Sequence, residues 1–160
     1  MDYLKYFRYL LKHKWYVLVE CARQGIIWRG LVHDMDKFRP KLFIPYVQYY
    51  YRGRHEKDKE AFDAAWDRHK KRNKHHWQHW LSPDGTPQEM PYPYNVEMFC
   101  DWVGVGKARG KCLPGDDRYD EVKCFYLRKK NEEDEKKRMK LHPNIQKWVE
   151  EKLFGRVLDN

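Results

Sequence analysis

Apolar side chains recur at three- and four-residue steps along most of the chain, which is the spacing of helices with one buried face. The row in the N-terminal segment is Leu4, Phe7, Leu11, Trp15, Leu18 and Ala22. Gly25 follows it, and glycine often ends a helix because it adopts the left-handed conformation without strain. We therefore expect a first helix that ends near Gly25 and buries this row.

The same spacing predicts an all-α chain of about six helices, with no strand. Pro40 stands where a helix begins, since proline is favoured at the first helical position, and Ser82–Pro87 has the composition of a loop. A short apolar turn is expected at residues 26–28. The further helices predicted are about 40–51, 57–81, 94–104, 119–130 and 143–153. We expect a surface loop at about 107–120, and a charged connector or exposed helix face at about 131–140.

Composition indicates one folded domain over residues 1–160. The mean hydropathy is -1.05 and 36% of residues are charged, but 16% are aromatic, and disordered chains are poor in aromatics. No segment approaches the ~20 apolar residues of a membrane helix, and the N-terminus lacks the apolar core and cleavage site of a secretory leader. We expect a cytoplasmic protein with no membrane partner; the oligomeric state stays open.

The net charge of +9 favours a polyanionic partner, although many solvated basic surfaces bind nothing. The four cysteines are far apart and contain no CxxC pair, so neither a zinc ribbon nor a disulfide scaffold is indicated. Charge therefore directs attention to phosphate-bearing ligands without selecting one.

Histidine and aspartate supply the candidate chemistry. His33 and Asp34 are adjacent, His13 precedes them on the first predicted helix, and Asp101 follows on a later one. Imidazole nitrogens and carboxylate oxygens both ligate divalent transition metals. An isolated His-Asp pair carries little information, but its combination with further histidines predicts a metal site.

The predicted helix over residues 57–81 carries most of those histidines. His69 and His76 are two helical turns apart and share a face with Asn73, whereas His75 and His79 form a second, displaced row. Buried imidazoles need polar partners. A metal ion would provide one, and carboxylates hydrogen-bonded to core histidines would do so equally well for any single residue. We interpret His13, His33, Asp34, His69, His76 and Asp101 together as metal ligands.

The order of these residues resembles the HD-domain superfamily of metal-dependent phosphohydrolases, and HDxxK (His33, Asp34, Lys37) resembles its variant with a phosphate-contacting lysine. The chain is more similar still to a small uncharacterised family of phages and bacteria. The segments that carry this resemblance are HKW from His13, HDMDKFRP from His33, AWDRHKKRNKHHWQHW from Ala65, MPYPYNVEMFCDWVGVG from Met90 and LHP from Leu141. It implies an HD-like helical bundle. Asp36 departs from HDxGK relatives and leaves the local loop conformation open.

The resemblance also implies a reaction: hydrolysis of a nucleotide or related phosphate ester by a metal-activated water. It gives His13, His33, Asp34 and Asp101 as core ligands, and His69 with His75 or His76 as ligands of a second ion if two ions are bound rather than one. Histidine and carboxylate ligands accommodate Mn, Fe, Co, Ni or Zn. The catalytic residues would be Asp34, Lys37 and Glu97. Substrate would contact Lys37, Arg72 and Asn73, and the residues expected to orient ligands are His75, His79 and Glu97.

Two other classes of function fit the sequence. A nucleic-acid-binding protein would use the basic charge and the aromatic residues, and its binding would depend steeply on salt but not on metal. A phage accessory protein would bind a nucleotide or host factor without turnover, in the host cytoplasm. Metal-dependent phosphate release separates the hydrolase from both.

Overall fold

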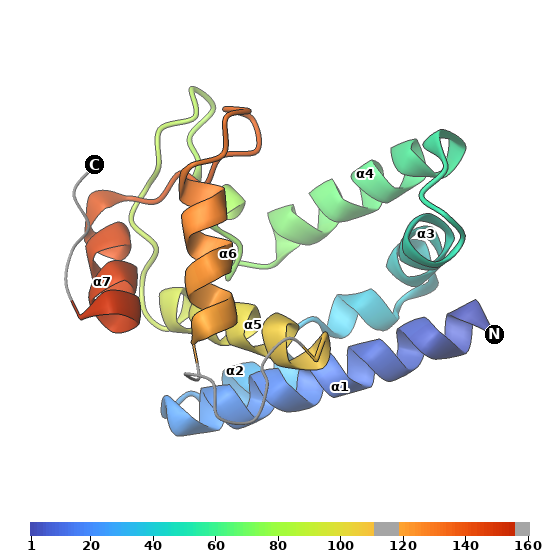
Figure 1. The fold of residues 1–160 in the computed structure, drawn as a ribbon, viewed down its shortest axis with the longest axis horizontal. Helices are drawn as coiled ribbons and strands as arrows, with labels where there is room; N and C mark the ends of the chain where they lie inside the picture. The colour runs from blue at the N-terminus through green and yellow to red at the C-terminus, as the bar shows by residue number, and fades with distance from the viewer. Residues whose placement is uncertain (111–118, 156–160) are drawn as a thin grey trace.

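The structure is a computed structural model that describes residues 1–110 and 119–155. Within these residues it is all-α, as predicted, with seven α-helices and two short 3-10 helices, η1 and η2. In Figure 1, α1 runs along one edge, and α5 lies along α1. The helices α3 and α4 stand over one end of α1, and α6 and α7 stand over the other, with α5 beneath α6. No helix in the described part of the chain has the length and apolarity needed to span a bilayer.

The first helix, α1 (Asp2–Arg23), has the expected length, and Gly25 follows it with φ +76°. Its predicted buried face is wrong. The buried residues are Tyr6, Leu10, His13, Val17, Glu20 and Cys21. The predicted row is exposed instead at Leu4, Phe7, Leu11 and Trp15. The buried row also carries His13 and Glu20, so the more continuous apolar row in the sequence is the exposed one.

Close packing against α5 (Tyr94–Ala108) selects the buried row of α1. A Cβ built on Gly104 would lie 2.4 Å from Val17 Cγ2 and 3.1 Å from Val17 N. The two helices therefore approach so closely that only glycine fits on α5 at this point. The short side chain of Val17 on α1 permits this close contact.

A Gly104→Ala variant is expected to lose about 1–3 kcal/mol of unfolding free energy, because a methyl group would overpack the contact with Val17. The sign of the change in unfolding free energy is decisive, because alanine that fits without a clash stabilises a helix by up to ~1 kcal/mol relative to glycine. Urea denaturation followed by circular dichroism measures it, and a variant as stable as the parent would contradict the close approach.

After α1 the chain forms α2 (Ile27–Val32), a helix where an apolar turn was expected, and then η1 (Met35–Phe38). The next helix, α3 (Pro40–Tyr51), begins at Pro40 as predicted. Tyr6 and Leu10 of α1 pack with residues of α3 and with Ala65 of α4 (Glu56–Arg72) to form one cluster of the core.

The predicted helix over residues 57–81 is too long. The observed α4 ends at Arg72, Asn73 is extended with φ -100° and ψ 108°, and η2 spans Trp77–Trp80. The Asn73 side chain donates a hydrogen bond to the His69 carbonyl oxygen at 3.0 Å. Asparagine side chains compete in this way with the helical backbone, so the helix stops and residues 73–76 turn toward α5.

The last two helices, α6 (Asp120–Lys130) and α7 (Pro143–Phe154), lie close to their predicted bounds. They pack on α5 through a second core cluster that includes Phe99, Tyr126 and Val149. The segment 131–140 is a connector without helix, where Arg138 donates to the carbonyl oxygen of Glu132. The loop predicted at 107–120 begins only after α5 ends at Ala108, and most of it lies outside the described residues.

Candidate metal centre

The His33–Asp34 pair forms a sharp turn between α2 and η1. Asp34 has φ +54°, in the left-handed region, which aspartate tolerates better than most residues that have a Cβ. The turn directs both side chains into the protein, where His33 and Asp34 are almost completely buried. Strained backbone of this kind is frequent at functional sites.

A first set of candidate ligands lies on one side of Asp34 and comes from α1, the turn and α5. His13 Nε2 lies 3.2 Å from Asp101 Oδ1 and 3.6 Å from Asp34 Oδ2. His33 Nε2 lies 3.4 Å from each of the same two oxygens. These four residues can hold one metal ion.

A second set lies on the other side of Asp34. Asp34 Oδ1 is 3.3 Å from His69 Nε2, at the end of α4, and 3.4 Å from His75 Nε2, in the segment that follows. His76 completes this group of possible ligands. Asp34 thus belongs to both sets, with Oδ2 facing the first and Oδ1 facing the second.

The spacing and the missing hydrogen bonds fit metal ions. Ligand atoms ~2.1 Å from a metal lie roughly 3.0–3.4 Å from one another in tetrahedral or octahedral sites, close to the distances above. The Nε2 atoms of all five histidines in the two sets have no hydrogen bond, nor has Asp101 Oδ1. Buried polar atoms are costly when unsatisfied, and a metal would satisfy these together.

Glu97, on α5, orients two of the histidines. Its Oε1 lies 3.0 Å from His33 Nδ1 and 3.2 Å from His75 Nδ1, and its Oε2 accepts a 2.7 Å hydrogen bond from Arg29 Nε. Burial opposes ionisation, but His33 and His75 lower the pKa of Glu97 to about 2. A carboxylate on the distal nitrogen fixes the ring and leaves Nε2 free for a metal. Because both carboxylate oxygens of Glu97 already contact histidine or arginine, these contacts favour its expected role of orienting ligands over its expected role as a catalytic residue.

Asp36 orients a third histidine, and the sequence analysis gave it no role. Its Oδ2 lies 3.1 Å from His69 Nδ1 and accepts a 2.9 Å hydrogen bond from Asn73 Nδ2. The aspartate at position 36, where the HDxGK pattern has glycine, thus holds the His69 ring and the Asn73 side chain in place. The available signal was an acidic residue two positions after Asp34, which a metal-bound histidine can use as its carboxylate partner.

Asp34 and His76 are held in the protonation states that bind a metal ion. Burial would raise the pKa of Asp34, but the positive charges of His33, Lys37 and His69 hold it well below its ordinary value. Burial, with His75 and His69 beside it, keeps the pKa of His76 well below its usual range. An ionised aspartate and a neutral imidazole are the forms that bind metal. Burial would lower the pKa of His33 and of His69, but Asp34 and the other carboxylates beside them raise both, so a bound ion would displace a proton from each of these two rings.

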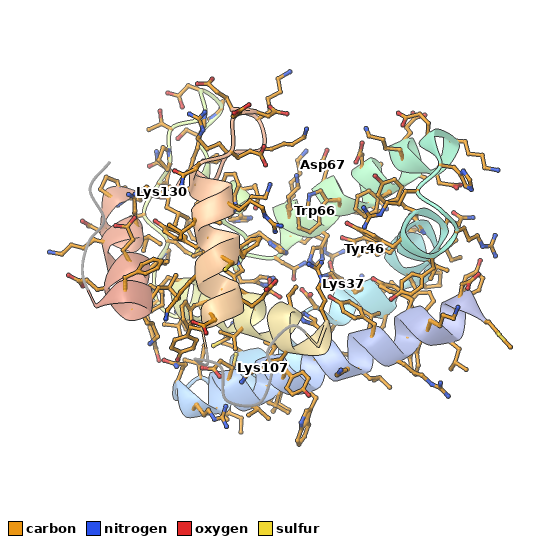
Figure 2. All side chains as sticks on the ribbon, in the orientation of Figure 1. Lys37, Tyr46, Trp66, Asp67, Lys107 and Lys130 are labelled. Carbon is orange, nitrogen blue, oxygen red and sulfur yellow. The ribbon has the colours of Figure 1, made fainter. Side chains whose placement is uncertain are left out.

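Lys37 is the cation closest to the centre, with Nζ 2.6 Å from Asp34 Oδ2. Burial would lower the pKa of Lys37, but Asp34 holds it well above its usual value, so the ammonium stays charged. Tyr6 and Tyr46 lie nearby with buried hydroxyls that make no hydrogen bond. Figure 2 places Lys37 and Tyr46 in the middle of the molecule, between α1 and α4.

The structure brings all six predicted ligands into the two sets and adds His75. The structure also shows the surroundings of four predicted residues in more detail. The helical-face argument for His76 over His75 was wrong, because the helix ends before both. Asn73 is engaged by Asp36, and Arg72 is exposed at the end of α4. His79 does not orient a ligand through Nδ1, which is bonded to the Lys71 carbonyl oxygen.

The orienting role of Asp36 gives a prediction: Asp36→Asn should weaken metal binding by about 10–100-fold, since an amide holds the His69 ring less firmly. Calorimetric titration of the metal-free protein with Mn²⁺ or Zn²⁺ measures the change. Asp63→Asn, on the exposed side of α4 where Asp63 contacts Lys59, is the matched control and should bind like the parent. Equal affinity of the two variants would contradict the role.

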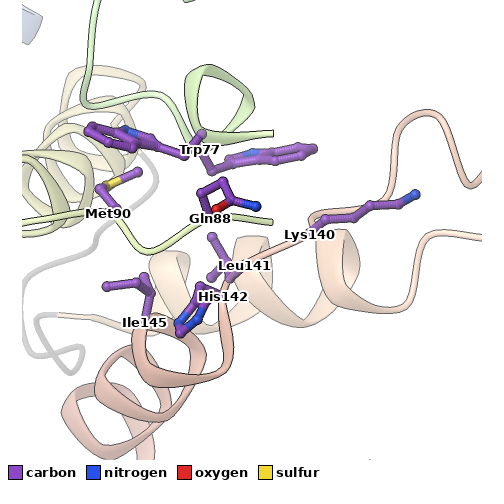
Figure 3. A pocket seen from close by; sticks show the side chains of 8 residues that line it. Trp77, Gln88, Met90, Lys140, Leu141, His142 and Ile145 are labelled. Atoms are coloured by element: carbon purple, nitrogen blue, oxygen red, sulfur yellow. The ribbon is translucent and has the colours of Figure 1, made fainter. Parts of the chain in front are cut away.

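A small pocket lies away from this centre (Figure 3), between η2, the segment at Gln88 and the start of α7. It is lined by Trp77, Met90, Leu141 and His142, among others. It contains none of the candidate ligands. His142 accepts a hydrogen bond from Asn144 N at the start of α7, so its contact here is that of a helix cap.

Comparison with known proteins identifies the family. Residues 2–154 match the model of a family of unknown function, DUF5662, and the chain belongs to it. No curated protein matches the chain. No solved structure matches it either. Since the family has no assigned function, the kind of site is inferred from the buried histidines and carboxylates, which could hold a metal ion.

Proposed function

We propose that this chain is a metal-dependent phosphohydrolase of the HD type that acts on a nucleotide or a related phosphate ester. The observation that carries the proposal is the position of Asp34, whose two oxygens face two separate sets of buried ligands. A carboxylate shared between two metal sites, with a lysine ammonium beside it, is suited to phosphoryl chemistry.

Bound divalent ions would lower the pKa of a coordinated water and polarise the phosphoryl group. The chain's own residues have separable tasks. His13, His33 and Asp101 hold one side of the centre, and Asp36 and Glu97 keep histidine rings in position. In the net reaction, water oxygen bonds to phosphorus, the phosphorus–ester oxygen bond breaks, and the alcohol leaves with a proton.

Lys37 is the residue proposed to bind the phosphoryl group. It is charged, buried and already beside Asp34, so a non-bridging phosphate oxygen would meet a fixed point charge. The unbonded hydroxyls of Tyr6 and Tyr46 supply donors for further phosphate oxygens. The basic surface would attract an anionic substrate over longer distances.

The test is hydrolysis by Mn-loaded protein, followed as phosphate release from nucleoside monophosphates and simple aryl phosphates and as conversion of cyclic nucleotides to monophosphates. We expect metal-dependent release that falls at least ~100-fold in Lys37→Met, with metal content unchanged. Lys41→Met, on the exposed start of α3, should retain activity. A fully metal-loaded protein that cleaves none of these would contradict the proposal and favour a binding protein without turnover.

A further inference from the structure

Residues 1–110 and 119–155 leave a broad apolar face uncovered on α1, α2 and η1. Its large side chains are between 39% and 69% exposed, whereas soluble monomers rarely expose contiguous apolar patches of more than a few hundred Å². The residues of this α1–α2 apolar face are Tyr3, Leu4, Phe7, Leu11, Trp15, Ile27, Trp28, Leu31, Val32 and Met35. In Figure 1, no other helix lies on the side of α1 that faces away from α3, α4 and α6.

The two helices hold this face together as one surface. Lys14 Nζ donates to the carbonyl oxygens of Leu31 and His33, at 2.6 and 3.0 Å. This fixes the end of α2 beside the middle of α1. A Cβ on Gly30 would lie 2.8 Å from Leu18 Cα, so the two backbones are almost in contact. The exposed rows of α1 and α2 are therefore adjacent.

The apolar row of α1 that extends from the exposed Leu4 to the half-buried Leu18 has a symmetric spacing. The intervals between its members are three, four, four and three residues, symmetric about Leu11. The row is Leu4, Phe7, Leu11, Trp15 and Leu18. Two copies of α1 packed antiparallel across a two-fold axis at Leu11 would place Phe7 against the partner subunit's Trp15. Such an isologous arrangement is the commonest in soluble oligomers.

We propose that the α1–α2 apolar face is the interface of a homodimer, with the two α1 helices antiparallel about Leu11. The ten side chains expose roughly 1,000 Å² per chain, so an interface that covers most of them would reach the ~800 Å² per partner of a standard stable interface. This inference is independent of the proposed function, since it uses the outward side of α1 and not the side that carries His13.

The response to salt distinguishes a second copy of the chain from an acidic protein or a membrane bound at the α1–α2 apolar face. Lys5, Arg8 and Lys12 lie along one edge of the face, and the acidic residues of α1 are Asp2, at its start, and the buried Glu20. An acidic protein or an anionic membrane would be held partly by these cations and released by salt. In a homodimer the cations repel weakly at the rim, so association is maintained or strengthened as salt increases.

The experiment is sedimentation velocity of the full chain at 1–100 µM (~10²-fold in concentration), in low and high salt. We expect a species of twice the 19.8 kDa chain mass that persists in high salt. Leu11→Lys places two ammonium groups on the axis and should weaken association at least ~100-fold. Because Leu11 is exposed, the variant should keep its helix content and its metal content.

The matched control is Leu127→Lys, an exposed leucine on α6 outside the face, which should dimerise like the parent. A parent chain that is monomeric at ~100 µM would overturn the proposal, including the case in which it binds acidic lipid vesicles instead. A Leu11→Lys variant that dimerises as well as Leu127→Lys would also overturn it.

Discussion

An Asp34→Asn variant should lose metal from both candidate sites. Asp34 Oδ2 lies beside the ligands of the first set and Oδ1 beside those of the second, so one substitution removes the shared anion. Asparagine tolerates the left-handed backbone at this position as well as aspartate does. The fold should therefore persist while metal content falls from the value of the parent to near zero.

Elemental analysis after loading and dialysis gives the answer, with circular dichroism to confirm the helices. Asp101→Asn is the matched control, because Asp101 belongs only to the first set. It should lower the metal content without abolishing it. If Asp34→Asn retains as much metal as the parent, Asp34 is not the shared ligand.

Removal of metal is expected to lower the unfolding temperature by roughly 8–16 °C. A ligand that binds only the folded state at ~1,000 times its Kd contributes about 4 kcal/mol, and each kcal/mol corresponds to about 2–4 °C for a chain of this size. The physical source is the set of buried imidazole nitrogens that have no hydrogen bond. Metal ligation would satisfy them, whereas the metal-free protein leaves them desolvated.

Differential scanning calorimetry with chelator, and then with added Mn²⁺ or Zn²⁺, measures this difference. The Asp34→Asn variant supplies the control, since its unfolding temperature should not respond to metal. A parent protein whose unfolding temperature is the same with chelator and with metal would show that the cluster is stable without ions.

The sequence predicted the helix boundaries best where a proline or glycine marks the first residue of a helix or follows its last turn. Pro40 and Pro143 begin α3 and α7, and Gly25 follows α1. It failed where a tertiary contact decides. The long predicted helix was interrupted at Asn73, whose side chain binds both Asp36 and the His69 carbonyl oxygen, and no residue near Asn73 in the sequence reveals Asp36 as its partner.

The candidate site was predicted from residue type more than from geometry. All six proposed ligands meet at the centre, but the argument from a shared helical face was wrong for His76. His75 has its Nε2 3.4 Å from Asp34 Oδ1 because residues 73–76 leave the helix. Periodicity can rank positions only within a helix, so a choice between two adjacent histidines in a turn was beyond it.

The buried face of α1 shows the same limit. Both of its rows carry apolar side chains, and the core uses the one that also carries His13 and Glu20 and fits against Gly104. The other row, centred on Leu11, is the stronger pattern in the sequence. A pattern of that strength on an exposed face is consistent with the homodimer interface proposed above.

Anomalous diffraction from crystals of the full chain loaded with Mn²⁺ or Zn²⁺ is the most direct test of the metal centre. We predict a peak on each side of Asp34, about 2.0–2.2 Å from its oxygens and from the histidine Nε2 atoms. Peaks confined to the protein surface, with none in coordination range of Asp34, would contradict the account.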